Sequence, residues 1–161
     1  MIDLNLSIDD ALQIAKEAEQ RTADFYADAY QKTKNPLGKS IFQELTEFER
    51  YHYRKLSELE DSLRSRGSYI HYENRELSVS AVSSKITENE ENPKSALEIL
   101  AMSMEIEIEA EKRYKGLQQQ TIDPEGKDMF KKLAREEAEH YRVVSNAYWN
   151  LSEKGIWKLP K

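Results

Sequence analysis

Two strings of the sequence decide the fold: ERYH at residues 49–52 and EAEH at residues 137–140. In each string a glutamate precedes a histidine by three residues, and residues three apart lie on the same face of an α-helix. Each string can therefore offer one oxygen and one nitrogen ligand to a point beside its helix. Two such strings on different helices predict two metal ions in a helical protein.

The offset between the strings, 88 residues, recurs along the chain. Residues 11–67 and 99–155 align at this offset without a gap, and both halves carry apolar residues at helical spacing. We infer two helical hairpins that derive from one ancestral unit and are related by a pseudo-twofold axis. Identical pairs include Leu12/Leu100, Glu19/Glu107, Tyr26/Tyr114, Pro36/Pro124, Gly38/Gly126, Phe42/Phe130, Leu45/Leu133, Tyr53/Tyr141 and Gly67/Gly155.

The composition favours a single all-α domain over residues 1–161. Hydrophobic residues make up 39% of the chain and charged residues 34%, with only five glycines and four prolines. This balance is typical of long, charged helices and not of a sheet protein. We expect hairpins at residues 8–67 and 93–155, joined by a crossover at 68–92 and followed by a tail at 156–161.

Composition also excludes several kinds of partner and site. No apolar run approaches the roughly 18 residues of a membrane span, and the first residues lack a signal-peptide pattern, so we expect a soluble, cytoplasmic protein without a membrane partner. A net charge of -6 without a basic stripe argues against nucleic acid. The absence of cysteine excludes disulfides, iron–sulfur clusters, thiolate zinc sites and an appended rubredoxin-type domain.

Residues 68–92 do not continue the helical pattern. Scattered apolar residues lie there among serines and asparagines, and we expect an extended connection with one helical turn near residues 79–86. Such a segment can span roughly 80 Å, whereas a helix of about 28 residues is only some 42 Å long. The crossover can therefore return along the whole bundle, as in four-helix bundles with one long connection.

Two further glutamates, Glu19 and Glu107, interrupt the apolar faces of the first and third expected helices. With Glu49 and Glu137 they would place four carboxylates in the core, where each charge costs several kcal/mol unless it is neutralised. Two divalent cations would neutralise all four. In the alternative interpretation the glutamates are solvated and the histidines are ordinary core residues bonded to nearby carboxylates.

Three stretches resemble the rubrerythrin branch of the ferritin-like superfamily: EQRTADFY at 19–26, KNPLGK at 34–39, and residues 42–54. The resemblance implies a ferritin-like four-helix bundle with one long crossover and a dinuclear iron centre. It also implies that Glu49 and Glu137 bridge the two metals, while Glu19 and Glu107 are terminal ligands. The implied metal ligands are Glu19, Glu49, His52, Glu107, Glu137 and His140.

The chain departs from this family in two ways. Classical rubrerythrins carry a further carboxylate at the position of Ala110, and we expect the nearby Glu109 and Glu111 to be solvated because their spacing is wrong. The nearly symmetric site looks more like the ferroxidase centre of bacterioferritins, whose haem-binding methionine is here Arg50. Without a rubredoxin domain, electrons must come from a separate donor protein such as a rubredoxin, or from substrate Fe(II).

The resemblance implies a di-iron oxidoreductase that reduces H2O2 to water or couples Fe(II) oxidation to O2 or H2O2. Oxygen and imidazole ligands suit Fe(II) or Mn(II), and zinc could occupy the site inertly. Tyr26 and Tyr114 lie two turns beyond Glu19 and Glu107 on the same faces. They are either hydrogen-bond donors to the ligands, and thus candidates for catalysis, or core aromatics.

Other functions are compatible with this ligand set: a ferritin-type iron-storage subunit, a metal-stabilised scaffold without catalysis, and a di-iron monooxygenase. Storage predicts a large hollow assembly, whereas the oxidoreductase predicts a homodimer or small oligomer with about two metal ions per chain. For Trp157 in the tail, the sequence allows either a cap on the bundle or a contact with another subunit.

Overall fold

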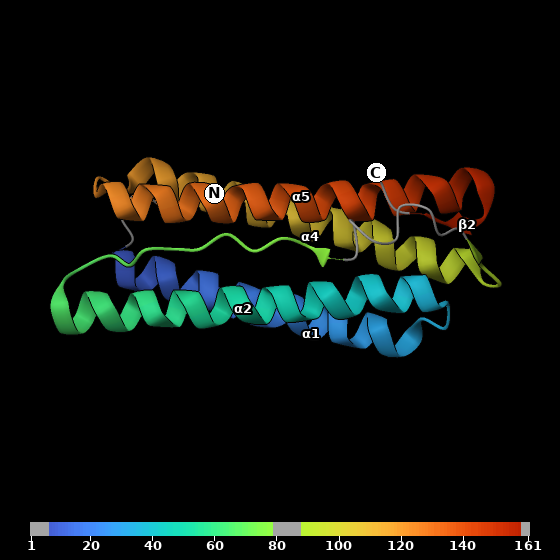
Figure 1. Ribbon diagram of the computed structural model, residues 1–161, viewed down its shortest axis with the longest axis horizontal. Coiled ribbons are helices and arrows are strands. Elements are labelled where there is room, and N and C mark those ends of the chain that lie inside the picture. Colours follow the sequence, from blue (N-terminus) through green and yellow to red (C-terminus); the bar gives the residue numbers. More distant parts are fainter. Residues whose placement is uncertain (1–6, 79–87, 159–161) are drawn as a thin grey trace.

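The computed structural model describes residues 7–78 and 88–158, in which four long helices run side by side (Figure 1). The elements are α1 (Ile8–Lys32), α2 (Pro36–Arg66), β1 (Glu88–Asn89), α4 (Pro93–Gln120), α5 (Pro124–Lys154) and β2 (Ile156–Trp157). Helix α1 packs along α2, and α4 packs along α5. This architecture confirms the predicted all-α four-helix bundle built from two hairpins. The helical turn expected near residues 79–86 lies outside the described residues.

Local chemistry sets the ends of α2 and α5 in the same way. Asn35 and Asp123 each accept hydrogen bonds from two backbone N–H groups of the helix that follows, and a proline occupies the first helical turn in both cases. Gly67 and Gly155 end α2 and α5 in the left-handed conformation, with φ of 67° and 69°. These caps fix where α2 and α5 start and stop, and hence the register of the two Glu-x-x-His strings.

The first part of the crossover, residues 68–78, lies lengthwise along the bundle beside α2 and α5 (Figure 1). Its backbone is held by both helices: the Tyr51 hydroxyl donates to the Glu73 carbonyl, and the Lys132 ammonium donates to the Tyr72 carbonyl. The Tyr72 side chain is 1% exposed. The crossover therefore contributes side chains to the interior of the bundle as well as connecting its halves.

Two aromatic residues extend the internal repeat beyond the hairpins. Trp157 of β2 lies against Gly38 at the start of α2, and Tyr69 of the crossover lies against Gly126 at the start of α5. Trp157 and Tyr69 are themselves separated by the 88-residue offset. Trp157 is fully buried, with its indole nitrogen within hydrogen-bonding distance of the Glu90 carboxylate. It therefore caps the bundle, the first of the two placements that the sequence allows.

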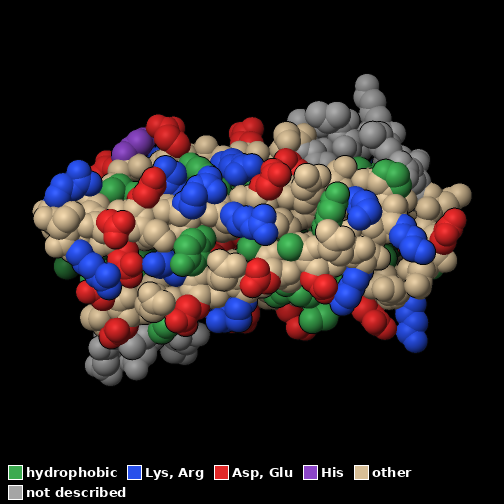
Figure 2. All heavy atoms as spheres, turned by 90° about the horizontal axis from the view of Figure 1, so that it is seen from below, with side chains coloured by type: hydrophobic (Ala, Val, Ile, Leu, Met, Phe, Trp, Pro, Cys, Tyr) green, Lys and Arg blue, Asp and Glu red, His purple; other side chains and the backbone are tan. Residues whose placement is uncertain are grey.

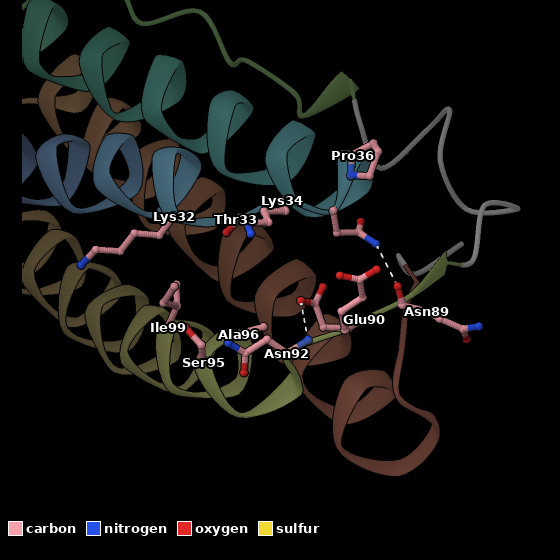
Figure 3. Close-up of a pocket in the computed structure, with 12 residues that line it drawn as sticks. Lys32, Thr33, Lys34, Pro36, Asn89, Glu90, Asn92, Ser95, Ala96 and Ile99 are labelled. Carbon is pink, nitrogen blue, oxygen red and sulfur yellow. Dashed lines mark hydrogen bonds between the residues drawn. The ribbon is translucent and has the colours of Figure 1, made fainter.

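The strands β1 and β2 pair antiparallel at this end of the molecule. Beside them is a pocket of about 330 Å³, lined by residues that include Lys32, Asn89 and Ser95 (Figure 3). The Asn35 amide donates to the Asn89 carbonyl, which joins the α1–α2 turn to β1. None of the six predicted metal ligands lines this pocket.

The apolar core consists of two clusters of buried residues, and no predicted ligand belongs to either. Fully burying one large apolar side chain contributes about 1.5–3 kcal/mol, so the two clusters hold the four helices together. One cluster includes Tyr26, Phe42, Leu45, Leu100, Val144 and Trp157. The other includes Leu12, Leu56, Leu59, Tyr114, Phe130 and Leu133.

The surface carries charges of both signs. On the face shown in Figure 2, acidic and basic side chains intermingle along the length of the bundle. Among the described residues, no helix is long and apolar enough to cross a membrane.

Candidate metal centre

The six predicted ligands converge inside the bundle, and each of their side chains is at most 1% exposed. They form two groups whose ligand atoms all lie within 4.8 Å of one another. Glu49 and Glu137 belong to both groups, as expected for residues that bridge two metals. One group is Glu19, Glu49, His52 and Glu137; the other is Glu49, Glu107, Glu137 and His140.

Both histidines turn Nδ1 toward the carboxylates. The Nδ1 atom of His140 lies 2.9 Å from Oε1 of Glu49 and 3.3 Å from Oε1 of Glu137. The Nδ1 atom of His52 lies 3.3 Å from the same Glu137 oxygen and 3.6 Å from Oε2 of Glu19. Helical spacing explains the convergence, because each Glu-x-x-His string presents both of its side chains on the face that points into the bundle.

Most of these ligand atoms have no hydrogen-bond partner among the described residues. The atoms include both oxygens of Glu49, both oxygens of Glu137 and Nδ1 of each histidine. Although Nδ1 of His140 is close to Glu49, the two are not aligned as a hydrogen bond requires. Buried polar atoms normally find partners, so a converging set of orphaned oxygens and nitrogens fits bound cations.

Each predicted tyrosine reaches across to the opposite hairpin. The Tyr26 hydroxyl donates to Oε1 of Glu107 over 2.6 Å, and the Tyr114 hydroxyl donates to Oε1 of Glu19 over 2.5 Å. Both tyrosine side chains are fully buried. Each bond occupies one oxygen of Glu107 or Glu19, and the other oxygen of each has no hydrogen-bond partner among the described residues. The part of these tyrosines in catalysis stays a prediction.

The crowding of charges changes the protonation of the carboxylates. Burial, followed by repulsion from Glu137, raises the pKa of Glu49 well above its ordinary value. The same two causes raise the pKa of Glu107 to about 7. Burial also opposes the ionisation of Glu137, but the adjacent His140 and His52 rings outweigh it and hold the pKa of Glu137 below its ordinary value.

The surroundings of the two histidines favour the protonated form of each ring in the metal-free protein. Burial by itself lowers the pKa of each ring, but the neighbouring carboxylates together raise it more, with Glu19 the largest contributor at His52 and Glu107 at His140. The pKa of each therefore lies well above its ordinary value. Since cations bind to unprotonated imidazole and carboxylate, metal binding must release these protons.

A further buried carboxylate, that of Glu136, contacts His52 of the centre and was not predicted from the sequence. Its Oε1 lies 2.8 Å from Nε2 of His52, on the side of the ring away from the ligands. It precedes the ligand Glu137 by one residue, so ligand spacing does not single it out. The available signal was a mismatch in the repeat, because Phe48 occupies the equivalent position in α2.

A pocket of about 380 Å³ lies beside the second histidine, His140. Its lining includes Phe48, Arg75, Glu136 and Glu139. The Nε2 atom of His140 has no hydrogen-bond partner among the described residues. The two imidazoles thus both turn Nδ1 toward the carboxylates, but the surroundings of their Nε2 atoms differ.

The acidic residues near Ala110 lie apart from the centre. Glu109 is exposed and lies 3.8 Å from the Lys112 ammonium, while Glu111 pairs with Lys115 over 2.7 Å. Neither belongs to a ligand group among the described residues. Ala110 itself is buried.

Four helices that bring six buried carboxylate and imidazole side chains into two adjoining groups define a class: the ferritin-like bundles with a candidate dinuclear metal centre. The rubrerythrin family model matches residues 1–60 and 98–156. The chain therefore belongs to the rubrerythrin family, which confirms the resemblance found in the sequence.

The fold has a counterpart among solved structures. A hypothetical protein from Pyrococcus furiosus is 23% identical in sequence and superposes with a TM-score of 0.72, over 92% of each chain. At this level of identity the likeness shows the fold alone. A search of curated proteins gave no match.

Proposed function

We propose that the protein is a non-haem di-iron oxidoreductase that reduces H2O2 or oxidises Fe(II) with O2 or H2O2. The observation that carries this proposal is that two ligand groups share Glu49 and Glu137. A shared pair of carboxylates would hold two cations close together, as two-electron chemistry requires. Membership of the rubrerythrin family supports the same reaction class.

The ligand set suits iron. Four carboxylates would balance two divalent cations, and the donor set of oxygen and imidazole nitrogen is one that Fe(II) and Mn(II) accept. Glu19 and His52 would complete one metal position, while Glu107 and His140 would complete the other. When bound, two Fe(II) ions supply the two electrons that convert H2O2 and two protons into two water molecules.

The protein's own residues would control protons and ligand geometry during this reaction. The hydroxyls of Tyr26 and Tyr114 hold the terminal glutamates in place through single oxygens. In the metal-free protein, burial and repulsion from Glu137 raise the pKa of Glu107 to about 7, so Glu107 would give up a proton when a metal binds near neutral pH. The apolar clusters on either side limit the access of water to the reacting groups.

The electrons for each further cycle would come from outside the chain, because the chain has no cysteine for a rubredoxin-type centre. We propose a separate donor such as a rubredoxin for peroxide reduction. In the ferroxidase reaction, substrate Fe(II) would be the donor. We further propose a cytoplasmic homodimer.

The test is anaerobic loading with Fe(II), followed by stopped-flow absorbance on mixing with H2O2 and, separately, with O2. We expect rapid oxidation by at least one of the two, at about two irons per chain. Loaded protein that reacts with neither oxidant would support a metal-stabilised scaffold. A large assembly on size-exclusion chromatography with many irons per chain would instead support iron storage.

A further inference from the structure

We propose that Glu136 is a positioning residue that fixes His52 and thereby makes the two metal positions unequal. The inference rests on the proposed dinuclear site, and it concerns how this chain holds that site. On this account the position that contains Glu19 and His52 is preformed and binds the first ion. The position that contains Glu107 and His140 is looser and binds the second.

The contacts of Glu136 define its role. Its carboxylate is buried, 7% exposed, and Oε1 lies 2.8 Å from Nε2 of His52. The same oxygen accepts a hydrogen bond from the Tyr72 hydroxyl over 2.5 Å, and Oε2 accepts one from the backbone N–H of Arg75 over 2.8 Å. Residues of the crossover thus hold both oxygens, so the position of the carboxylate does not depend on its contact with His52.

The consequence for His52 follows from the chemistry of imidazole. A carboxylate at Nε2 keeps the proton of the neutral ring on that nitrogen and leaves the lone pair on Nδ1. Nδ1 is the atom that faces Glu19 and Glu137. Outer hydrogen bonds of this kind orient a histidine and make it a better donor to a metal, and their loss typically weakens metal binding by about 10–100-fold.

The second histidine lacks this support. The residue of α2 equivalent to Glu136 is Phe48, whose ring meets His140 edge-on with centroids 4.4 Å apart. An aromatic ring accepts no hydrogen bond comparable to that of a carboxylate. Among the described residues, Nε2 of His140 has no hydrogen-bond partner. His140 also lines the pocket of about 380 Å³, as Glu136 does, whereas His52 does not.

The experiment titrates metal-free protein with Co(II) and follows the ring nitrogens by NMR after labelling histidine with 15N. The chain has only three histidines, and His71 is exposed in the crossover, where it serves as an internal reference. In the wild type we expect the His52 signals to respond to the first equivalent of Co(II) and the His140 signals to the second. The His52 Nε2 proton should exchange slowly with solvent, and the His140 proton quickly.

Two variants separate positioning from mere folding. We expect Glu136→Gln to weaken the first step by 10–100-fold and to speed exchange at His52, with little change at His140. Tyr72→Phe, which keeps the carboxylate and removes one of its donors, should give a smaller change in the same direction. The matched control is Glu139→Gln, which changes a charge one turn further along α5 that pairs with Arg142 instead of a histidine.

The outcomes distinguish the inference from the function on which it rests. If His52 and His140 respond to Co(II) together in the wild type, or if Glu136→Gln titrates like Glu139→Gln, the inference is wrong while the dinuclear site stands. If the wild type binds no Co(II) at the two histidines, the proposed function is wrong and the inference goes with it.

Discussion

The two hairpins of the bundle match closely at the centre and differ just outside it. In both, a buried glutamate accepts a hydrogen bond from a tyrosine of the opposite hairpin, and a Glu-x-x-His string adds two more residues to the candidate ligand groups. Outside this layer the Phe48 ring contacts both histidines, but only His52 also meets a carboxylate, that of Glu136. The residues at the centre are thus alike in the two halves, whereas the residues just outside it make the halves unequal.

The largest expected effect comes from removing a shared ligand. Glu49→Ala or Glu137→Ala takes a carboxylate from both ligand groups, so both positions should lose affinity by more than about 100-fold. Glu19→Ala or Glu107→Ala takes a ligand from one group only and should leave one ion bound. Anaerobic equilibrium dialysis with Fe(II) measures the stoichiometry. Equal losses in all four variants would contradict the assignment of bridging and terminal residues.

The next effect is the pH dependence of the metal-free protein. The raised pKa of Glu107, about 7 against an ordinary 4.5, means that folding favours its protonated form. Its contribution to stability is present at low pH and is lost as the pH rises through about 7. The raised pKa values of both histidines act in the same direction. The free energy of unfolding should therefore fall between about pH 5 and pH 8, by on the order of 3 kcal/mol from Glu107 alone.

Urea unfolding with and without metal measures this effect. Bound cations replace the protons, so the stabilisation by Fe(II) or Co(II) should grow as the pH rises through the same window. A metal-free protein that becomes more stable from pH 5 to pH 8 would contradict the protonation pattern described here.

A smaller effect is expected where aromatic residues pack on the two turns. A methyl group at Gly38 would lie 2.8 Å from the Trp157 ring, and one at Gly126 would lie 2.6 Å from the Tyr69 ring. Gly38→Ala and Gly126→Ala should each reduce the free energy of unfolding by about 1–3 kcal/mol, despite the better helix propensity of alanine. Thermal unfolding of metal-free protein tests both. A gain in stability would show that the aromatic residues do not pack as described.

The smallest effect concerns the hydroxyls that support the terminal glutamates. Tyr26→Phe and Tyr114→Phe each remove one hydrogen bond and should cost about 1 kcal/mol of stability. The two costs should be similar, because these bonds belong to the symmetric layer. Tyr53→Phe, at a partly exposed ring, is the matched control and should change stability by less than about 0.5 kcal/mol. A large difference between the first two variants would break the symmetry proposed for the centre.

Much of this molecule could be predicted from its sequence because helices and repeats are periodic. The 88-residue offset and the helical spacing predict the hairpins, and they place Glu19 and Glu107 level with the two Glu-x-x-His strings. The structure brings all six residues together. The sequence left open whether Tyr26 and Tyr114 donate hydrogen bonds to the ligands or are core aromatics. The coordinates were needed to decide, because spacing along one helix does not show which residue of the opposite hairpin lies beside each hydroxyl.

The rest could not be predicted because it depends on an irregular segment. Glu136 is held by Tyr72 and the backbone of Arg75, both in the crossover, where no periodicity indicates which side chain turns inward. The packing of Tyr69 and Trp157 on opposite turns depends on the same kind of long-range contact. Such contacts form only in the folded bundle, and the sequence gives little indication of them. The one indication here is that Phe48 and Glu136 differ although they occupy equivalent positions of the repeat.

The most direct test of the central claim is anomalous X-ray diffraction at the iron edge from crystals loaded anaerobically with Fe(II). We predict two peaks inside the bundle, one beside Nδ1 of His52 and one beside Nδ1 of His140, with Glu49 and Glu137 contacting both. A single peak would contradict the dinuclear site. So would a centre without any peak, where protons alone link the carboxylates and imidazoles.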